Sequence, residues 1–294
     1  MPLDPSTASA SPLLPYSGPR KQTFTQLGAP WKVDRYDSDQ TGLCEYEFNS
    51  LGYRGAEYQA DAPFKVFLFG ESDAFGLGVN YEEIWAVQVA RERARQAGFD
   101  AEQTCIMNFS ECGASNSLTA RMLVTQCNAV RPDLILIQIA EDRRVELLDA
   151  TSGWNGGPWF ALKEVKKQIK KAPDLSREER KRMFEMLARG RAYLDYCTPH
   201  QGLYETLIEL LLMHETTLRL GVESLAVGKE LGRFQAQATL QDPRLGPLVR
   251  CLRPNWLRDV PVAETFAQDT SGVDEHHMGP LGHSTIAQHL LGRS

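Results

Sequence analysis

Short apolar runs alternate with segments of helical periodicity along most of the chain. Each apolar run is bounded by glycine, proline or polar residues, which is typical of buried strands. The predicted strands are 64–69, 104–108, 132–139 and 222–227. The predicted helices are 82–98, with Gly98 at its C-cap, then 115–130, 203–220 and 281–291. This alternation predicts an α/β domain with a parallel sheet and right-handed crossovers.

Two regions do not follow this alternation of predicted strands and helices. Residues 1–30 are rich in Pro, Ser and Ala and are expected to form a flexible N-terminal segment, so that 31–294 make the folded domain. Residues 151–200 are interpreted as a helical insertion. It is expected to contain a loop at 154–159 and two charged helices, at 160–171 and 176–196, the second with a capping box of Ser176 and Glu179. Residues 228–270 give no clear pattern.

Composition indicates an ordinary globular domain. The 294 residues are 42% hydrophobic and 24% charged, and the net charge of −6 argues against nucleic-acid binding. A basic run at 163–171 is interpreted as a solvated helix face, with docking of an acidic partner as the alternative. Neither a secretory signal nor an apolar stretch long enough for a membrane span is found, so we expect a cytoplasmic protein without membrane association.

The six cysteines are scattered and include no pair with zinc-type spacing. We therefore expect reduced thiols, and neither a metal nor a cofactor. Cys112 is the one cysteine near a candidate motif, which leaves a cysteine nucleophile as an alternative.

Two βα connections carry candidate chemistry. Gly70, Glu71 and Ser72 directly follow the first predicted strand, where α/β folds place ligands, and a glycine there permits a tight turn that exposes the hydroxyl. The alternative is that Ser72 only caps a helix. After the second strand, Gly113 offers a backbone N–H to a developing oxyanion, or is simply a turn residue.

The third candidate segment lies near the C-terminus. Asp274 precedes His277 by three residues, ahead of the last predicted helix, and such an acid can orient an imidazole as a general base. His276 and His283 lie close by and are interpreted as surface or helix-cap residues. Metal binding by the histidine cluster is an alternative, which the absence of a second group of residues with ligand spacing disfavours.

Taken together, these segments resemble the SGNH/GDSL hydrolase superfamily, in matching order from about residue 49 to the C-terminus. The residues at 70–72 stand where the family has Gly-Asp-Ser, Gly113 matches the second block, and Asp274 with His277 matches the last block. The resemblance implies a flavodoxin-like three-layer α/β/α fold. It implies Ser72 as nucleophile, His277 as base, Asp274 as its orienting acid, and the N–H groups of Ser72 and Gly113 in the oxyanion hole.

The sequence departs from the family pattern at two positions. Glu71 replaces the Asp of the first block, and Glu141 stands where an Asn normally donates to the oxyanion. An ionised carboxylate cannot donate a hydrogen bond, and its charge opposes an oxyanion. Four explanations stay open: Glu141 is protonated, the reaction is unusual, another donor replaces it, or the match to the family is offset at this strand end. The candidate donors are Asn116, Gln138 and Arg143.

Three functions are compatible with these residues. The favoured one is a serine-dependent hydrolase that cleaves an acyl ester or thioester through an acyl-serine, its substrate a small molecule or carrier-bound. The second is an O-acyltransferase with the same triad, in which the insertion forms a lid and Trp154, Trp159 and Phe160 line an acyl pocket. The third is an inactive SGNH-like binding protein, which the substitutions at Glu71 and Glu141 suggest.

Overall fold

The protein is described by a computed structural model. The structure describes residues 11–15, 33–34, 43–44, 46–148, 153–156, 166, 169–170, 176–228, 231, 234, 236–253, 255–260 and 278–292, and for some of these the backbone alone. Asp274, His276, His277, Trp159 and Phe160 lie outside the described residues, and of Trp154 only the backbone is described.

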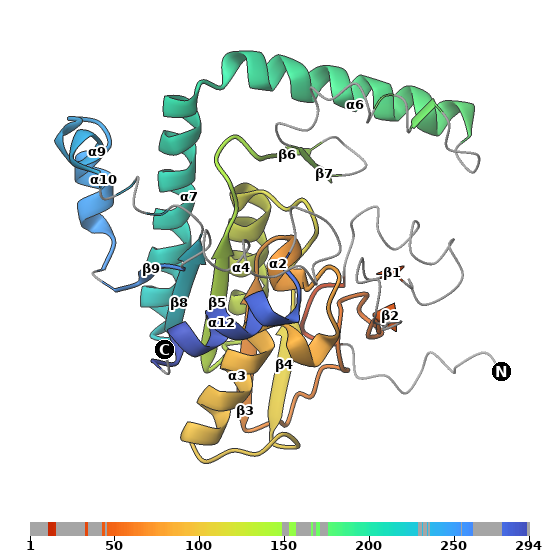
Figure 1. Cartoon of the computed structure of the whole chain (residues 1–294), viewed down its shortest axis with the longest axis vertical. Coiled ribbons are helices and arrows are strands. Elements are labelled where there is room, and N and C mark those ends of the chain that lie inside the picture. The colour runs from red at the N-terminus through yellow and green to blue at the C-terminus, as the bar shows by residue number, and fades with distance from the viewer. Residues whose placement is uncertain are drawn as a thin grey trace.

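A five-stranded parallel sheet forms the centre of the molecule (Figure 1). Its strands are β3 (Phe64–Phe69), β4 (Thr104–Asn108), β5 (Leu134–Ile139), β8 (Glu223–Gly228) and β9 (Leu257–Asp259). They lie side by side in the order β4-β3-β5-β8-β9, and every neighbouring pair is parallel. Numbered by their order along the chain, the strands run 2-1-3-4-5, which is the flavodoxin-like order.

Helices cover both faces of this sheet because its central strands, β3 and β5, are largely apolar on both sides. Alternate β3 residues enter different clusters: Phe67 and Phe69 face one, Val66 and Leu68 the other. The first cluster is covered by α4 (Asn116–Ala129) and α7 (Pro199–Leu220), and the second by α3 (Trp85–Gln96) and α12 (Pro280–Leu290). The predicted three-layer α/β/α fold is confirmed.

Short elements complete the described part of the chain. They are α2 (Ser72–Phe75), the 3₁₀ helix η1 (Tyr81–Glu83), α9 (Gln237–Gln241), α10 (Gly246–Cys251) and the antiparallel pair β1 (Val33–Asp34) and β2 (Leu43–Cys44). The segment 82–98, predicted as one helix, is divided between η1 and α3. Helix α3 has Ala97 at its C-cap, and Gly98 follows with a φ of 90°.

In the described part of the insertion, the long helix is α6 (Arg177–Tyr196), which lies across the upper end of α7 in Figure 1. Its capping box is confirmed, since Ser176 accepts a hydrogen bond from the Glu179 N–H and the Glu179 carboxylate accepts one from the Ser176 N–H. The loop predicted to begin at Trp154 is wrong over its first residues. Strand β7 (Gly153–Gly156) pairs antiparallel with β6 (Val145–Leu148), with Leu147 opposite Trp154 in the register, and this pairing replaces the expected turn.

Part of the N-terminal segment lies against the body. Leu13 is buried in the core, and the Leu14 backbone exchanges two hydrogen bonds with the Gln126 side chain on α4, at 3.1 and 3.0 Å. Residues 1–10 and 16–30 lie outside the described residues.

Candidate active site

Ser72 lies at the carboxyl end of β3, as the first residue of α2. Glu71 occupies the N-cap position, so the alternative in which Ser72 caps the helix is wrong. Gly70 joins strand to helix with a φ of 156°, and a Cβ at this position would lie 2.6 Å from the Cβ of Gln138. The glycine thus lets the turn pack directly against β5.

The position of this turn in the sheet is the one at which doubly wound folds bind ligands. The chain passes from β3 to β4 on one side and then returns to β5 on the other, so β3 and β5 flank the point where the strand order reverses. Ligands bind in the crevice outside the carboxyl ends of the strands at this switch point. Ser72 lies at that point.

Two buried carboxylates flank Ser72 in sequence, and one side chain from β5 binds both. Gln138 Nε2 donates to Glu71 Oε1 at 3.2 Å and to Asp73 Oδ2 at 3.1 Å. Glu71, Asp73 and Gln138 are each at most 4% exposed. A buried carboxylate must be hydrogen-bonded or paired to remain charged, and such charge-assisted bonds are strong. Gln138 therefore fixes the turn of Ser72 to the neighbouring strand.

Arg144 supplies the positive charge at this turn. It is ion-paired with Glu71, and its Nη2 lies 3.3 Å from Glu141 Oε2. The Glu141 side chain is 66% exposed, whereas that of Glu71 is 6% exposed. One guanidinium thus contacts both carboxylates and offsets part of the negative charge that the sequence places near Ser72.

The loop after β4 lies beside the turn of Ser72. The N–H of Glu111 donates to the Gly70 carbonyl at 2.9 Å, and Ala114 closes a turn by donating to the Glu111 carbonyl at the same distance. Gly113 is inside this turn with a φ of 76°, a conformation that glycine adopts without strain. The structure therefore brings the loop of Gly113 next to the turn of Ser72.

The three donors considered as replacements at position 141 are engaged elsewhere. The Asn116 side chain forms two hydrogen bonds with the peptide groups of Ala140, accepting at 2.8 Å and donating at 3.1 Å. Gln138 binds the two carboxylates, and Arg143 Nη2 donates to the Leu194 carbonyl at 2.9 Å. Asn116 thus acts as a clamp between the start of α4 and the end of β5.

The residues around the predicted base are partly described. Met278, which follows His277, is buried in the same hydrophobic cluster as Ala74, two residues after Ser72. His283 on α12 is fully buried, and its Nδ1 accepts a hydrogen bond from the Trp85 N–H at 3.2 Å. His283 is therefore an internal link between α12 and α3, and the expectation of a surface or cap residue is wrong for it.

Arg144 was not singled out by sequence reasoning, and Gln138 was considered only as an oxyanion donor. Gln138 carried a usable signal, because it is the single polar residue in a strand of buried apolar ones. Arg144 carried none, since an arginine on a loop is usually solvated.

Among the described residues, no group of three or more His, Cys, Asp and Glu side chains could hold a metal ion. Among the cysteines whose side chains are described, Cys105, Cys127, Cys197 and Cys251 form no disulfide. No helix in the described part of the chain is both long enough and apolar enough to cross a membrane.

No protein-family model matches this chain, and no curated protein is significantly similar to it. Among solved structures, the esterase EstA from Pseudoalteromonas sp. is similar, with 9% identity, a TM-score of 0.43, and coverage of 78% of this chain and 95% of that one. Axe2, an acetyl-xylooligosaccharide esterase from Geobacillus, shows 14% identity and a TM-score of 0.40, covering 79% and 94%. A protein assigned to the G-D-S-L family from Desulfitobacterium hafniense shows 10% identity and a TM-score of 0.38, covering 78% and 99%. A shared activity does not follow from similarity at this level.

Proposed function

We propose that the chain is a serine-dependent hydrolase of the SGNH/GDSL type, which cleaves an acyl ester or thioester. The observation that carries this proposal is the place of Ser72, on a tight glycine turn at the switch point of a flavodoxin-like sheet. A plain strand-to-helix connection does not need a buried Gln138 that binds the carboxylates on both sides of one serine.

In the proposed reaction, the Ser72 oxygen attacks the acyl carbonyl while His277 takes the serine proton. Asp274 holds the imidazole and stabilises the imidazolium. The carbonyl oxygen becomes an oxyanion that accepts hydrogen bonds from the N–H groups of Ser72 and Gly113. His277 then protonates the leaving alcohol or thiol as the bond to the carbonyl carbon breaks. Water repeats the sequence on the acyl-serine and releases the acid.

The charged side chains near Ser72 determine whether the site stabilises or opposes an oxyanion. Glu71 and Glu141 on their own would oppose negative charge on the substrate. Arg144 contacts both, so the carboxylates and the guanidinium form a network instead of two isolated charges. This pairing supports an active site in spite of the two departures from the family pattern.

The test is labelling with a fluorophosphonate, followed by mass spectrometry of the intact protein and of its peptides. We expect one adduct, located on Ser72, absent from Ser72→Ala and formed at least about 100-fold more slowly by His277→Ala. Cys112→Ala is the control for the thiol alternative and should label like the wild type. A folded wild-type protein without an adduct would exclude an activated serine and favour the binding protein.

A second measurement separates hydrolysis from transfer. The same acyl-serine is consumed by water in an esterase or thioesterase and by a hydroxyl in an O-acyltransferase. Turnover of acyl esters and thioesters, with and without an added alcohol, gives the partition between acid and new ester. Acid as the main product at millimolar alcohol is expected for the hydrolase.

A further inference from the structure

The insertion contains a groove far along the sequence from Ser72. Its volume is about 610 Å³, within the range of about 300–1,000 Å³ that is usual for small-ligand sites. The lining combines four apolar residues of α6 with three cations and one acid. These are Phe184, Leu187, Ala188 and Ala192, then Lys166, Lys170 and Arg191, and Asp195.

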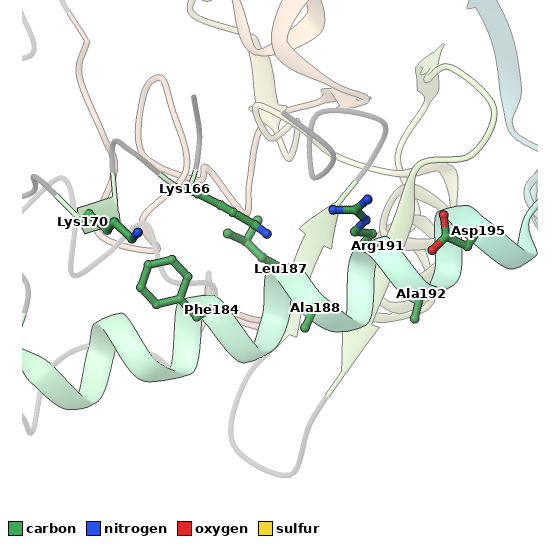
Figure 2. Close-up of a pocket in the computed structure, with 8 residues that line it drawn as sticks. All are labelled: Lys166, Lys170, Phe184, Leu187, Ala188, Arg191, Ala192 and Asp195. Carbon is green, nitrogen blue, oxygen red and sulfur yellow. The ribbon is translucent and has the colours of Figure 1, made fainter. Parts of the chain in front are cut away.

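The apolar side of the groove is formed by one face of α6. Leu187 is buried and Phe184 is partly buried, and both belong to the small hydrophobic cluster of the insertion. Phe184, Leu187 and Arg191 project from α6 toward the side on which Lys166 and Lys170 lie (Figure 2). A molecule in the groove would therefore meet apolar surface and positive charge together.

The three cations have no salt-bridge partner within the part of the chain that the structure describes. This positive charge is not a property of the whole molecule. Residues 151–196 contain 11 Lys and Arg against 6 Asp and Glu, a net charge of +5 within a chain of net charge −6. Positive charges gathered around an apolar surface repel one another until an anion neutralises them.

We propose that this groove is a binding site for an amphipathic anion, a molecule with an alkyl chain and one phosphate or carboxylate group. The alkyl chain lies along Phe184 and Leu187, where it removes apolar surface from water. The anionic group lies near Lys166 and Arg191, where it gains charge-assisted hydrogen bonds. Lys170, at the other end of the lining in Figure 2, adds to the positive field. The proposal does not depend on the chemistry of Ser72, and the Ser72→Ala variant should bind such a molecule as the wild type does.

The test is isothermal titration calorimetry of the full chain with decyl phosphate. The decyl phosphate is kept below its critical micelle concentration. We expect saturable binding that weakens as salt is added, because part of the affinity is electrostatic. Arg191→Gln and Lys166→Gln should each weaken binding about threefold to tenfold. Arg189→Gln is the matched control, because Arg189 is exposed on the same helix but does not line the groove. It should bind like the wild type.

Two further probes separate the parts of the ligand. Decyl maltoside carries the same alkyl chain without charge, and inorganic phosphate carries the charge without the chain, so both should bind at least tenfold more weakly than decyl phosphate. Equal binding of decyl maltoside, an equal loss in Arg189→Gln, or no saturable binding to a folded chain would overturn the proposal. Circular dichroism of each variant shows that it is folded.

Discussion

Arg144, on the loop after β5, is ion-paired with Glu71, the residue immediately before Ser72. The exposed fractions of the two side chains are 12% and 6%, so the pair is largely withdrawn from water. It joins the loop after β3 to the loop after β5, at the switch point of the sheet. The pair therefore affects both the stability of the fold and the position of the serine.

Arg144→Met is expected to lower the free energy of unfolding by about 3–5 kcal/mol, because it leaves a buried carboxylate without its guanidinium. Urea unfolding measures the loss. Arg95→Met is the control, since the Arg95 side chain is 70% exposed in its pair with Glu92, and it should leave the urea midpoint almost unchanged. The double variant Glu71→Gln with Arg144→Met should recover part of the loss. Equal losses in Arg144→Met and Arg95→Met would contradict this account.

Gly70→Ala is expected to destabilise the protein and to slow labelling of Ser72. The added Cβ would lie 2.6 Å from Gln138 Cβ and 3.0 Å from Ala74 Cβ, and such overpacking costs about 1–3 kcal/mol beyond the backbone strain. Gly98→Ala is a matched control, because Gly98 has a φ of 90° and nothing within 4 Å of a Cβ. It should show only the backbone cost of about 1–2 kcal/mol, with unchanged labelling. Similar unfolding curves for the two variants would show that packing against Gln138 is unimportant.

Glu209 on α7 gives a pH dependence of stability. Burial raises the pKa of its carboxyl to about 7, and the nearby acids Glu205, Asp142 and Glu146 act in the same direction. The folded state holds this proton more tightly than the unfolded chain, so stability falls as pH rises from about 4.5 to about 7. Glu209→Gln should therefore stabilise the protein by about 2 kcal/mol at pH 8 and have little effect at pH 4. Urea unfolding at both pH values tests this, with Glu185→Gln on α6 as an exposed control.

His214 gives the opposite pH dependence. Its buried ring packs edge-on against Trp256, and its Nε2 accepts a hydrogen bond from the Arg253 N–H at 3.2 Å. Burial lowers the pKa of this imidazole below its usual 6.5. The neutral form contributes stability that is present above about pH 6.5 and is lost as pH falls through the lowered pKa. His214→Gln should be less stable than the wild type at pH 7.5 and should lose less stability between pH 7 and pH 5. An unchanged slope in that interval would contradict this assignment.

The sheet could be predicted from sequence where strands are buried on both faces. The predicted strands at 64–69 and 104–108 match β3 and β4 in the structure, because a continuous apolar run between polar ends leaves little freedom of assignment. Strand β9 was not predicted. It has three residues, Leu257 to Asp259, two of them charged and exposed, and it joins the sheet edge only through pairing with β8. Nothing local in those residues encodes that pairing.

The candidate site was predictable in part for a similar reason. Ser72 and Gly113 follow strands that the sequence identifies, so their approach at one edge of the sheet follows from topology. The engagement of Asn116 with Ala140, and of Arg144 with two carboxylates, depends on side-chain geometry that no spacing reveals. Asp274 and His277 remain predictions from sequence.

Gln138 makes the hydrogen bonding of the Ser72 turn depend on the alignment of β5 with β3. Its amide binds Glu71 and Asp73 only while β5 is paired with β3 in the observed register, in which Phe69 lies beside Ile137. A slip of one residue would place Ile137 or Ile139 against the two carboxylates and leave them without this donor. Reactivity of Ser72 would then be a kinetic marker of correct assembly at the centre of the sheet, acquired only after the two strands have found their alignment during folding.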